Sequence, residues 1–147
     1  MKNLIFIPSF LQGLAMFFDE FYFHRKRGLP LWERIGHPLD TLTVLTCFAW
    51  LILMPLQPSS LLNWVGWVSF SCLWVTKDEW IHHRSCSTGE VWLHSVLFIL
   101  HPICLLSVGW MAWNGGYEWF IKLQTFLLIV FMIYQFTYWN LLWKPKK

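Results

Sequence analysis

Charged residues are scarce in this sequence. Asp, Glu, Lys and Arg make up 13% of the 147 residues, against about 25% in a typical soluble domain. The hydrophobic share is 56%, and aromatic residues alone account for 20%. This composition excludes an ordinary soluble domain and predicts an integral membrane protein. The net charge of +3 is scattered between apolar segments, so we expect membrane lipids as partners and no nucleic acid.

Cysteine is also rare, and other chemical motifs are missing. The four cysteines form no C-x-x-C motif, which excludes a structural zinc site built on thiolates. Three of them lie in apolar segments, and the role of Cys86, which lies between two such segments, is left open. The sequence contains no phosphate-binding Gly-rich loop and no nucleophile motif. It also lacks a linker or low-complexity stretch, so residues 1–147 are expected to form a single transmembrane domain.

Long apolar runs are what the sequence does have. A helix needs about 20 apolar residues to cross the hydrocarbon core of a membrane, and helices satisfy their own backbone groups in lipid. The fold class we predict is therefore an all-α integral membrane protein. Five transmembrane helices are expected, at about residues 4–24, 36–56, 61–81, 91–113 and 118–142. The first four are predicted to form a bundle from two helical hairpins, and the fifth to pack against it or to mediate oligomerisation.

The distribution of Lys and Arg predicts an orientation. Nine of the 11 basic residues fall in the first connection, in the third connection or at the C-terminus. The positive-inside rule then places the N-terminus outside and the C-terminus in the cytoplasm, and we expect residence in a bacterial inner membrane. A cleaved signal peptide is an alternative interpretation of the N-terminus. Pro8 and Ser9 interrupt its apolar stretch, which favours a retained span.

The remaining charge is concentrated in two similar segments, residues 19–37 and 78–94. Both read Asp-Glu, three residues, His-Arg, then a connection with Gly, then Glu, three residues and His. This internal repeat produces far more Glu-x-x-x-His pairs than random placement of five Glu and six His would give. The pairs are Glu20 with His24, Glu33 with His37, Glu79 with His83, and Glu90 with His94.

This spacing predicts a metal centre. Positions i and i+4 share one face of a helix, so each pair offers a carboxylate and an imidazole to one point. If the two hairpins pack about a pseudo-two-fold axis, all eight side chains converge near the cytoplasmic face. Carboxylates gathered in an apolar surrounding need cations to neutralise them. We therefore predict two metal ions held by all eight residues, with iron favoured and zinc or manganese as alternatives.

Other polar residues extend the predicted site. Asp19 and Asp78 precede the first glutamate of each copy, Asp40 follows His37 by three residues, and His101 follows His94 by seven. We expect these four side chains to hydrogen-bond the metal ligands or to add to them. The competing interpretation is that all these groups form ordinary salt bridges at the membrane interface. A capping box would explain Glu90 alone, because Glu20 and Glu79 lie at the C-terminal ends of predicted helices, where the helix dipole disfavours acids.

The predicted ligand set resembles that of the di-iron and di-manganese carboxylate bundles, in which four helices supply inward glutamates and Glu-x-x-His pairs. The resemblance lies in the use of paired acids and histidines on four helices. The spacing differs, because it is four residues here rather than three, and the number of histidine ligands is doubled. The function we predict is an oxidoreductase that acts on a lipid-soluble substrate or electron donor. Alternatives are a zinc- or manganese-dependent membrane hydrolase and a non-enzymatic metal-binding or haem-binding redox protein. No catalytic residue is identified, and the oligomeric state is left open.

Overall fold

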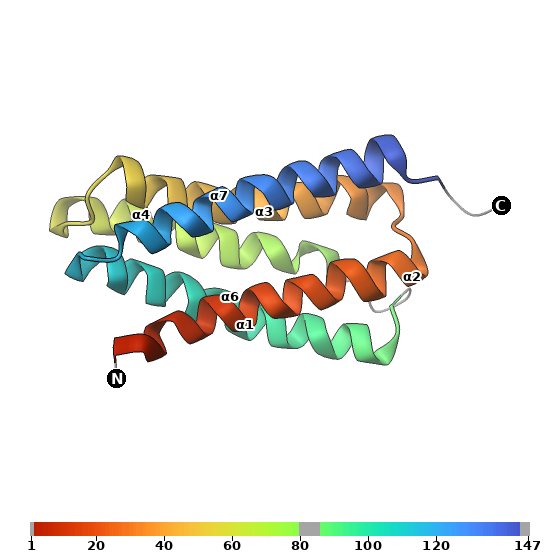
Figure 1. Ribbon diagram of the computed structural model, residues 1–147, viewed down its shortest axis with the longest axis horizontal. Helices are drawn as coiled ribbons and strands as arrows, with labels where there is room; N and C mark the ends of the chain where they lie inside the picture. The colour runs from red at the N-terminus through yellow and green to blue at the C-terminus, as the bar shows by residue number, and fades with distance from the viewer. Residues whose placement is uncertain (1, 80–85, 145–147) are drawn as a thin grey trace.

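The computed structural model describes residues 2–79 and 86–144, which form helices and no strand. Five long helical segments run side by side along one axis (Figure 1). The first comprises a 3₁₀ turn (Lys2–Phe6), α1 (Ile7–Phe18), a π-helical segment (Asp19–His24) and α2 (Arg25–Arg27). The others are α3 (Leu31–Leu53), α4 (Pro58–Trp74) with a 3₁₀ turn (Val75–Asp78), α6 (Thr88–Asn114), and α7 (Glu118–Thr137) with a π-helical segment (Tyr138–Leu142). The all-helical prediction is confirmed for this part of the chain.

Four of these segments are long and apolar enough to cross a membrane, which indicates a membrane protein. They are Leu4–Arg27, Leu31–Leu53, Thr88–Asn114 and Glu118–Leu142. The predicted span at residues 61–81 corresponds to α4, which has 17 residues. A 3₁₀ turn continues this helix to Asp78, and within the described residues the segment is not among the four.

Local sequence explains where the helices begin and end. Pro58 begins α4, where its missing N–H costs nothing. Ser87 caps α6, because its side chain accepts a hydrogen bond from the backbone N–H of Glu90 at 3.4 Å. Gly28 and Gly115 follow α2 and α6 with φ of 78° and 71°, a conformation that glycine adopts without strain.

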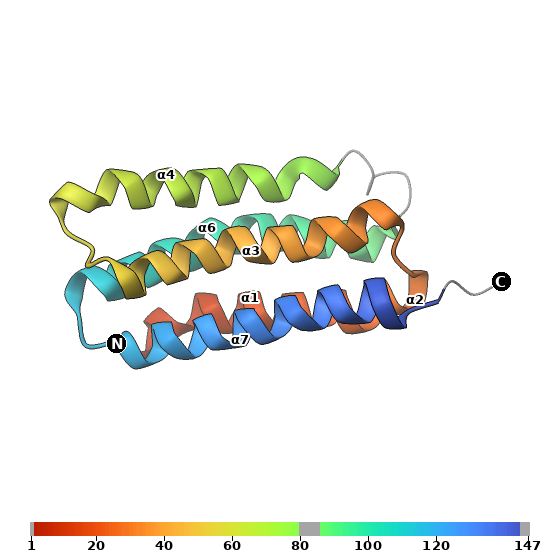
Figure 2. The ribbon, with the colours of Figure 1, turned by 90° about the horizontal axis from the view of Figure 1, so that it is seen from above.

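The helices stack in layers (Figure 2). One layer holds α1 and α7, the next holds α3 and α6, and α4 lies behind these two. The helix at residues 118–142 was expected to be an outer packing helix. Instead α7 lies along α3 inside the four-helix arrangement, and the outermost helix is α4. The pseudo-two-fold relation between the two hairpins stays a prediction.

An apolar core holds α4 in place. Trp64 of α4 is buried and donates a hydrogen bond from Nε1 to the backbone oxygen of Cys47 in α3, at 3.2 Å. Its ring also covers Gly109 of α6, where an added Cβ would lie only 2.2 Å from a ring carbon. The small size of Gly109 is therefore what allows α4 and α6 to approach.

The chain turns bring the charged segments to one end of the bundle. The connection between α2 and α3, the start of α6 and the C-terminus lie at the right of Figure 1, whereas the N-terminus lies at the left. The π-helical segment Asp19–His24 therefore lies near the first turns of α3 and α6 and near the end of α7. Glu33 and Glu90 stand in those first turns, where the helix dipole stabilises a negative charge.

Candidate metal centre

The π-helical segment determines which acids face His24. A π-helix has a wider turn than an α-helix and pairs residues i and i+5. His24 consequently contacts both preceding acids: its Nε2 lies 3.2 Å from Asp19 Oδ2, and its Nδ1 lies 3.4 Å from Glu20 Oε2. The α-helical spacing had predicted only the contact with Glu20. Asp19, expected to support the ligands, is thus placed beside His24 as directly as Glu20.

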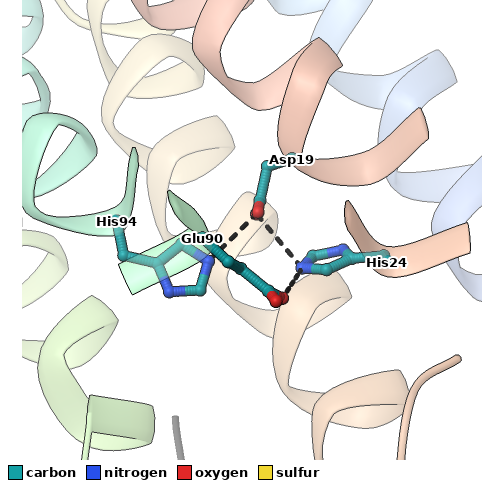
Figure 3. A group of neighbouring side chains, drawn as sticks. All are labelled: Asp19, His24, Glu90 and His94. Atoms are coloured by element: carbon teal, nitrogen blue, oxygen red, sulfur yellow. Dashed lines mark hydrogen bonds and ion pairs between the residues drawn. The ribbon is translucent and has the colours of Figure 1, made fainter. Parts of the chain in front are cut away.

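Four buried side chains from the first helix and α6 form one group with metal-binding potential (Figure 3). We call Asp19, His24, Glu90 and His94 the α6 group. Each offers a ligand atom, and these atoms all lie within 4.8 Å of one another. His94 Nε2 is 3.1 Å from Asp19 Oδ1, and His24 Nε2 is 3.9 Å from Glu90 Oε1. The predicted pair Glu90 and His94 is therefore brought together with His24 of the first copy.

A second group joins the first helix to α3. Glu20, His24 and His37, which we call the α3 group, also offer ligand atoms within 4.8 Å of one another. The rings of His24 and His37 are nearly perpendicular, with centroids 4.5 Å apart. His24 belongs to both groups, with Nε2 towards Asp19 and Glu90 and Nδ1 towards Glu20.

Burial raises the free-energy cost of ionised side chains in these groups. Glu20, Glu33 and Glu90 each expose 2% or less of their surface, and His24 exposes none. Arg27 supplies one positive charge: its guanidinium binds Glu33 through two nitrogens, at 3.1 and 2.6 Å, and Glu90 at 3.0 Å. Asp19 and Glu20 contact imidazoles instead. Their charge must be balanced by protonated histidines or by bound cations.

Helix α7 and its π-helical end orient Glu20. Trp139 Nε1 donates to Glu20 Oε1 at 2.5 Å, and Gln135 Nε2 donates to Glu20 Oε2 at 3.4 Å. Gln135 is itself fixed, because its Oε1 accepts a hydrogen bond from Thr41 Oγ1 at 2.7 Å. Sequence reasoning missed this role because residues 118–142 contain no acid or histidine after Glu118. The available signal was a glutamine inside an otherwise apolar run.

A proline also ties α7 to the start of α3. Pro38 has no N–H, so the carbonyl of Arg34, four residues earlier, loses its helical partner. Asn140 Nδ2 donates to that carbonyl at 3.1 Å. In return, Arg34 Nη1 contacts the carbonyl of Trp139 at 3.5 Å. The residues that surround His37 and Glu20 are thereby locked to each other.

Other predicted ligands lie differently. Glu33 belongs to neither group; its carboxylate binds Arg27 and lies 4.0 Å from His37 Nε2. Glu79 also belongs to neither group. His83 and the side chain of Asp78 lie outside the described residues. Of the second copy of the repeat, Glu90 and His94 are therefore the members placed in a group.

The remaining predicted supporting residues contact other side chains. Asp40 Oδ1 forms an ion pair with Lys77 Nζ at 2.5 Å. His101 Nε2 is hydrogen-bonded to Ser71 Oγ at 3.0 Å. Cys86 precedes α6 and the first turn that carries Glu90. Burial raises the pKa of the Cys86 thiol to about 12, so the thiol is protonated at neutral pH.

A small cavity gives access to both groups. Its volume is about 120 Å³, and its lining includes Asp19, Glu20, His37 and His94. This space is large enough for water molecules or for the reacting end of a larger molecule. The candidate centre therefore has open volume beside the ligand atoms.

No family model, curated protein or solved structure matches this chain. Function is therefore argued from the site itself, because a helical bundle can host many unrelated activities. The site combines buried carboxylates, imidazoles that face them, and an adjoining cavity. A buried Asp/Glu/His cluster of this kind can bind a metal ion.

Proposed function

We propose that this chain is a membrane metalloprotein that holds two metal ions, one in the α6 group and one in the α3 group. The observation that carries the proposal is the position of His24 between the groups, with a different ring nitrogen towards each. Its Nε2 is buried and makes no hydrogen bond of good geometry within the described part of the chain. A cation beside this atom would compensate the buried carboxylates.

The donor atoms favour iron. The α3 group offers two imidazoles and one carboxylate, the combination found in non-haem Fe(II) oxygenases. The α6 group offers two imidazoles and two carboxylates, and neither group contains a thiolate. If both groups held an ion, His24 would be the residue common to both, with Nε2 towards the α6 group and Nδ1 towards Glu20. This arrangement differs from the expected eight-residue site, because His24 replaces a carboxylate as the shared ligand.

The activity we propose is oxidoreduction of a lipid-soluble substrate. Iron exchanges one electron as it passes between its ferrous and ferric states, so a pair supports a two-electron change in an organic molecule. The carboxylates of Glu20 and Asp19 would neutralise part of the positive charge of the ions. Trp139 and Gln135 keep the carboxylate of Glu20 in place. The cavity beside both groups admits the reacting part of the substrate.

Elemental analysis tests this proposal. The untagged protein is purified in detergent, incubated anaerobically with Fe(II), and separated from free metal on a desalting column. We expect about two iron ions per chain, as in other dinuclear carboxylate bundles. The control Glu118→Ala changes a fully exposed carboxylate at the start of α7 and should keep both ions. Retention of no ion would contradict the metal centre and favour salt bridges.

Redox titration separates the proposed activity from its alternative. The iron-loaded protein should lose its ferric absorption on stoichiometric reduction by dithionite and regain it on oxidation. Protein purified from cells should carry iron rather than zinc. Two zinc ions, with no redox-active metal, would overturn the oxidoreductase and favour a hydrolase in which zinc activates water.

A further inference from the structure

A second, larger cavity lies between the helices, beside the first. It has a volume of about 720 Å³ and is bounded by α1, α3, α6 and α7. Cavities of about 300–1,000 Å³ commonly hold small molecules. Its walls are mainly apolar and include Phe17, Phe48, Leu105 and Leu128. Such walls suit a hydrocarbon chain rather than a polar metabolite.

The larger cavity adjoins the small cavity at the candidate metal centre. The two share the lining residues Gln12, Met16, Val44, His101 and Phe131. A molecule that extends through both would have one end among apolar side chains and the other beside the two ligand groups.

The wall between α1 and α7 faces the lipid side of the protein. Phe10 and Phe17 of α1 and Leu127 and Val130 of α7 line the larger cavity. All four are also exposed on the outer surface, by 48% to 69%. A molecule dissolved in the bilayer can therefore enter sideways between α1 and α7.

Aromatic contacts fix the two ends of this opening. Phe6 packs against Phe120 with ring centroids 4.7 Å apart, and Phe21 stacks on Tyr134 at 5.2 Å. These pairs join the first helix to α7 above and below the cavity. The opening is thus confined to the middle of the membrane-spanning segments, at the depth of hydrocarbon chains.

One polar atom in the cavity wall is left without a partner. Gln12 Oε1 is buried and accepts no hydrogen bond from the described residues, and Gln12 Nε2 makes only a long contact of 3.9 Å with Met16 Sδ. Burying an unsatisfied amide oxygen costs about 1–3 kcal/mol. Because Gln12 lines both cavities, a hydroxyl on a ligand that spans them can donate to this oxygen.

We infer that the adjoining cavities bind one lipid-soluble molecule, with its hydrocarbon chain in the larger cavity and a hydroxyl-bearing head at Gln12. The molecule enters from the bilayer between α1 and α7. This inference deepens the proposed function, on which it rests for one point only: that the head then meets the metal centre as substrate. Binding itself follows from the cavities and Gln12.

A glycine supplies a matched pair of variants. Gly13 lines the larger cavity, and a Cβ added there would meet no atom within 4 Å. A Cβ at this position is therefore free of clashes, and we expect the side chain of Gly13→Leu to occupy part of the cavity. Gly66 of α4 has equally open surroundings, is exposed, and lines neither cavity. Gly66→Leu is the control, because both changes raise helix propensity by a similar amount.

The experiment uses a long-chain alcohol with a diazirine in its chain, added to full-length protein in phosphatidylcholine nanodiscs. After illumination, labelled peptides are mapped by mass spectrometry. We expect saturable labelling of residues 9–17 and 124–131 that excess unlabelled alcohol abolishes. Labelling should fall about tenfold or more in Gly13→Leu, where the new side chain occupies the space, and should persist in Gly66→Leu. Equal labelling of both variants would overturn the inference.

Two further arms identify the ligand. The methyl ether of the same alcohol cannot donate a hydrogen bond, so it should compete less well than the alcohol in wild-type protein and equally well in Gln12→Leu. A diazirine-bearing phospholipid tests whether ordinary membrane lipid fills the space. If that phospholipid labels the cavity and the alcohol fails to displace it, the inference is wrong.

Iron content, measured on the same samples, separates the two proposals. Gly13→Leu should retain both ions, so that its loss of labelling cannot reflect loss of the centre. Saturable labelling of a protein that holds no metal would remove the proposed function and leave this inference standing. Two bound ions without saturable labelling would overturn this inference and leave the proposed function standing.

Discussion

The α6 group and the α3 group share His24 but are held by different parts of the molecule. In the α6 group, Glu90 is bound by the guanidinium of Arg27. In the α3 group, Glu20 is oriented by the neutral donors of Trp139 and Gln135. A neutral donor fixes a carboxylate and leaves its charge for an ion, whereas a guanidinium already neutralises part of it. The comparison teaches that the acid of the α3 group is held by α7, whereas Glu90 of the α6 group is held by Arg27 at the end of the first helical segment.

The largest effect is expected where the groups meet. His24→Ala removes the ring nitrogen that each group uses, so both sites should be lost and iron should fall from about two ions per chain to near zero. Elemental analysis measures the ion content, and circular dichroism checks that the variant remains helical. One ion retained with full affinity would show that His24 is not the shared ligand.

Single-group variants should each remove one ion. His94→Ala takes a ligand from the α6 group and His37→Ala takes one from the α3 group, so each chain should keep about one ion. The double variant should keep none. If either single change released both ions, the groups would be one site rather than two, and the comparison would fail.

A smaller effect is expected from the residue that orients Glu20. Trp139→Phe preserves an aromatic ring but removes the N–H group that donates a hydrogen bond to Glu20. Loss of such an outer hydrogen bond lowers metal affinity by about 10- to 100-fold. Titration with Fe(II) should show this loss for one of two ions, with the other unchanged. Trp143→Phe, at the neighbouring ring, serves as the control, and equal weakening of both ions would contradict the assignment.

The smallest effect is expected at Asp40. Sequence analysis placed it beside the ligands, but its carboxylate pairs with Lys77, and such partly exposed pairs contribute about 0–1 kcal/mol. Asp40→Asn should therefore change the affinity for each ion by less than about fivefold. Loss of an ion in the same titration would contradict this expectation and show that Asp40 is a metal ligand.

Much of the fold could be predicted from the sequence, because apolar run length and Pro or Gly punctuation report directly on helices in lipid. The order of packing could not be predicted. The repeat suggested that two hairpins form the bundle, whereas α7 lies beside α1 and α3 and α4 lies outside. Helix pairing depends on side-chain fit, such as Trp64 over Gly109, and periodicity does not encode it.

The candidate site was predicted in outline. Acid and histidine spacing led us to expect that Glu20 with His24, and Glu90 with His94, approach one another, and each pair lies within one of the two groups. It assumed regular α-helix, so it could not anticipate that a π-helical turn would bring Asp19 to His24. Arg27 was counted only among the basic residues of the first connection, and its contacts with Glu33 and Glu90 depend on the fold of that connection. The spacing of acids and histidines thus predicted the residue types of the cluster, whereas tertiary packing determined which of these residues lie together.

The most direct test of the central claim is anomalous diffraction from crystals of the iron-loaded protein, recorded on both sides of the iron absorption edge. The account predicts two iron peaks, one on each side of the His24 ring, the first among Asp19, Glu90 and His94 and the second between Glu20 and His37. A map without iron at these positions, or with a single peak away from His24, would contradict it.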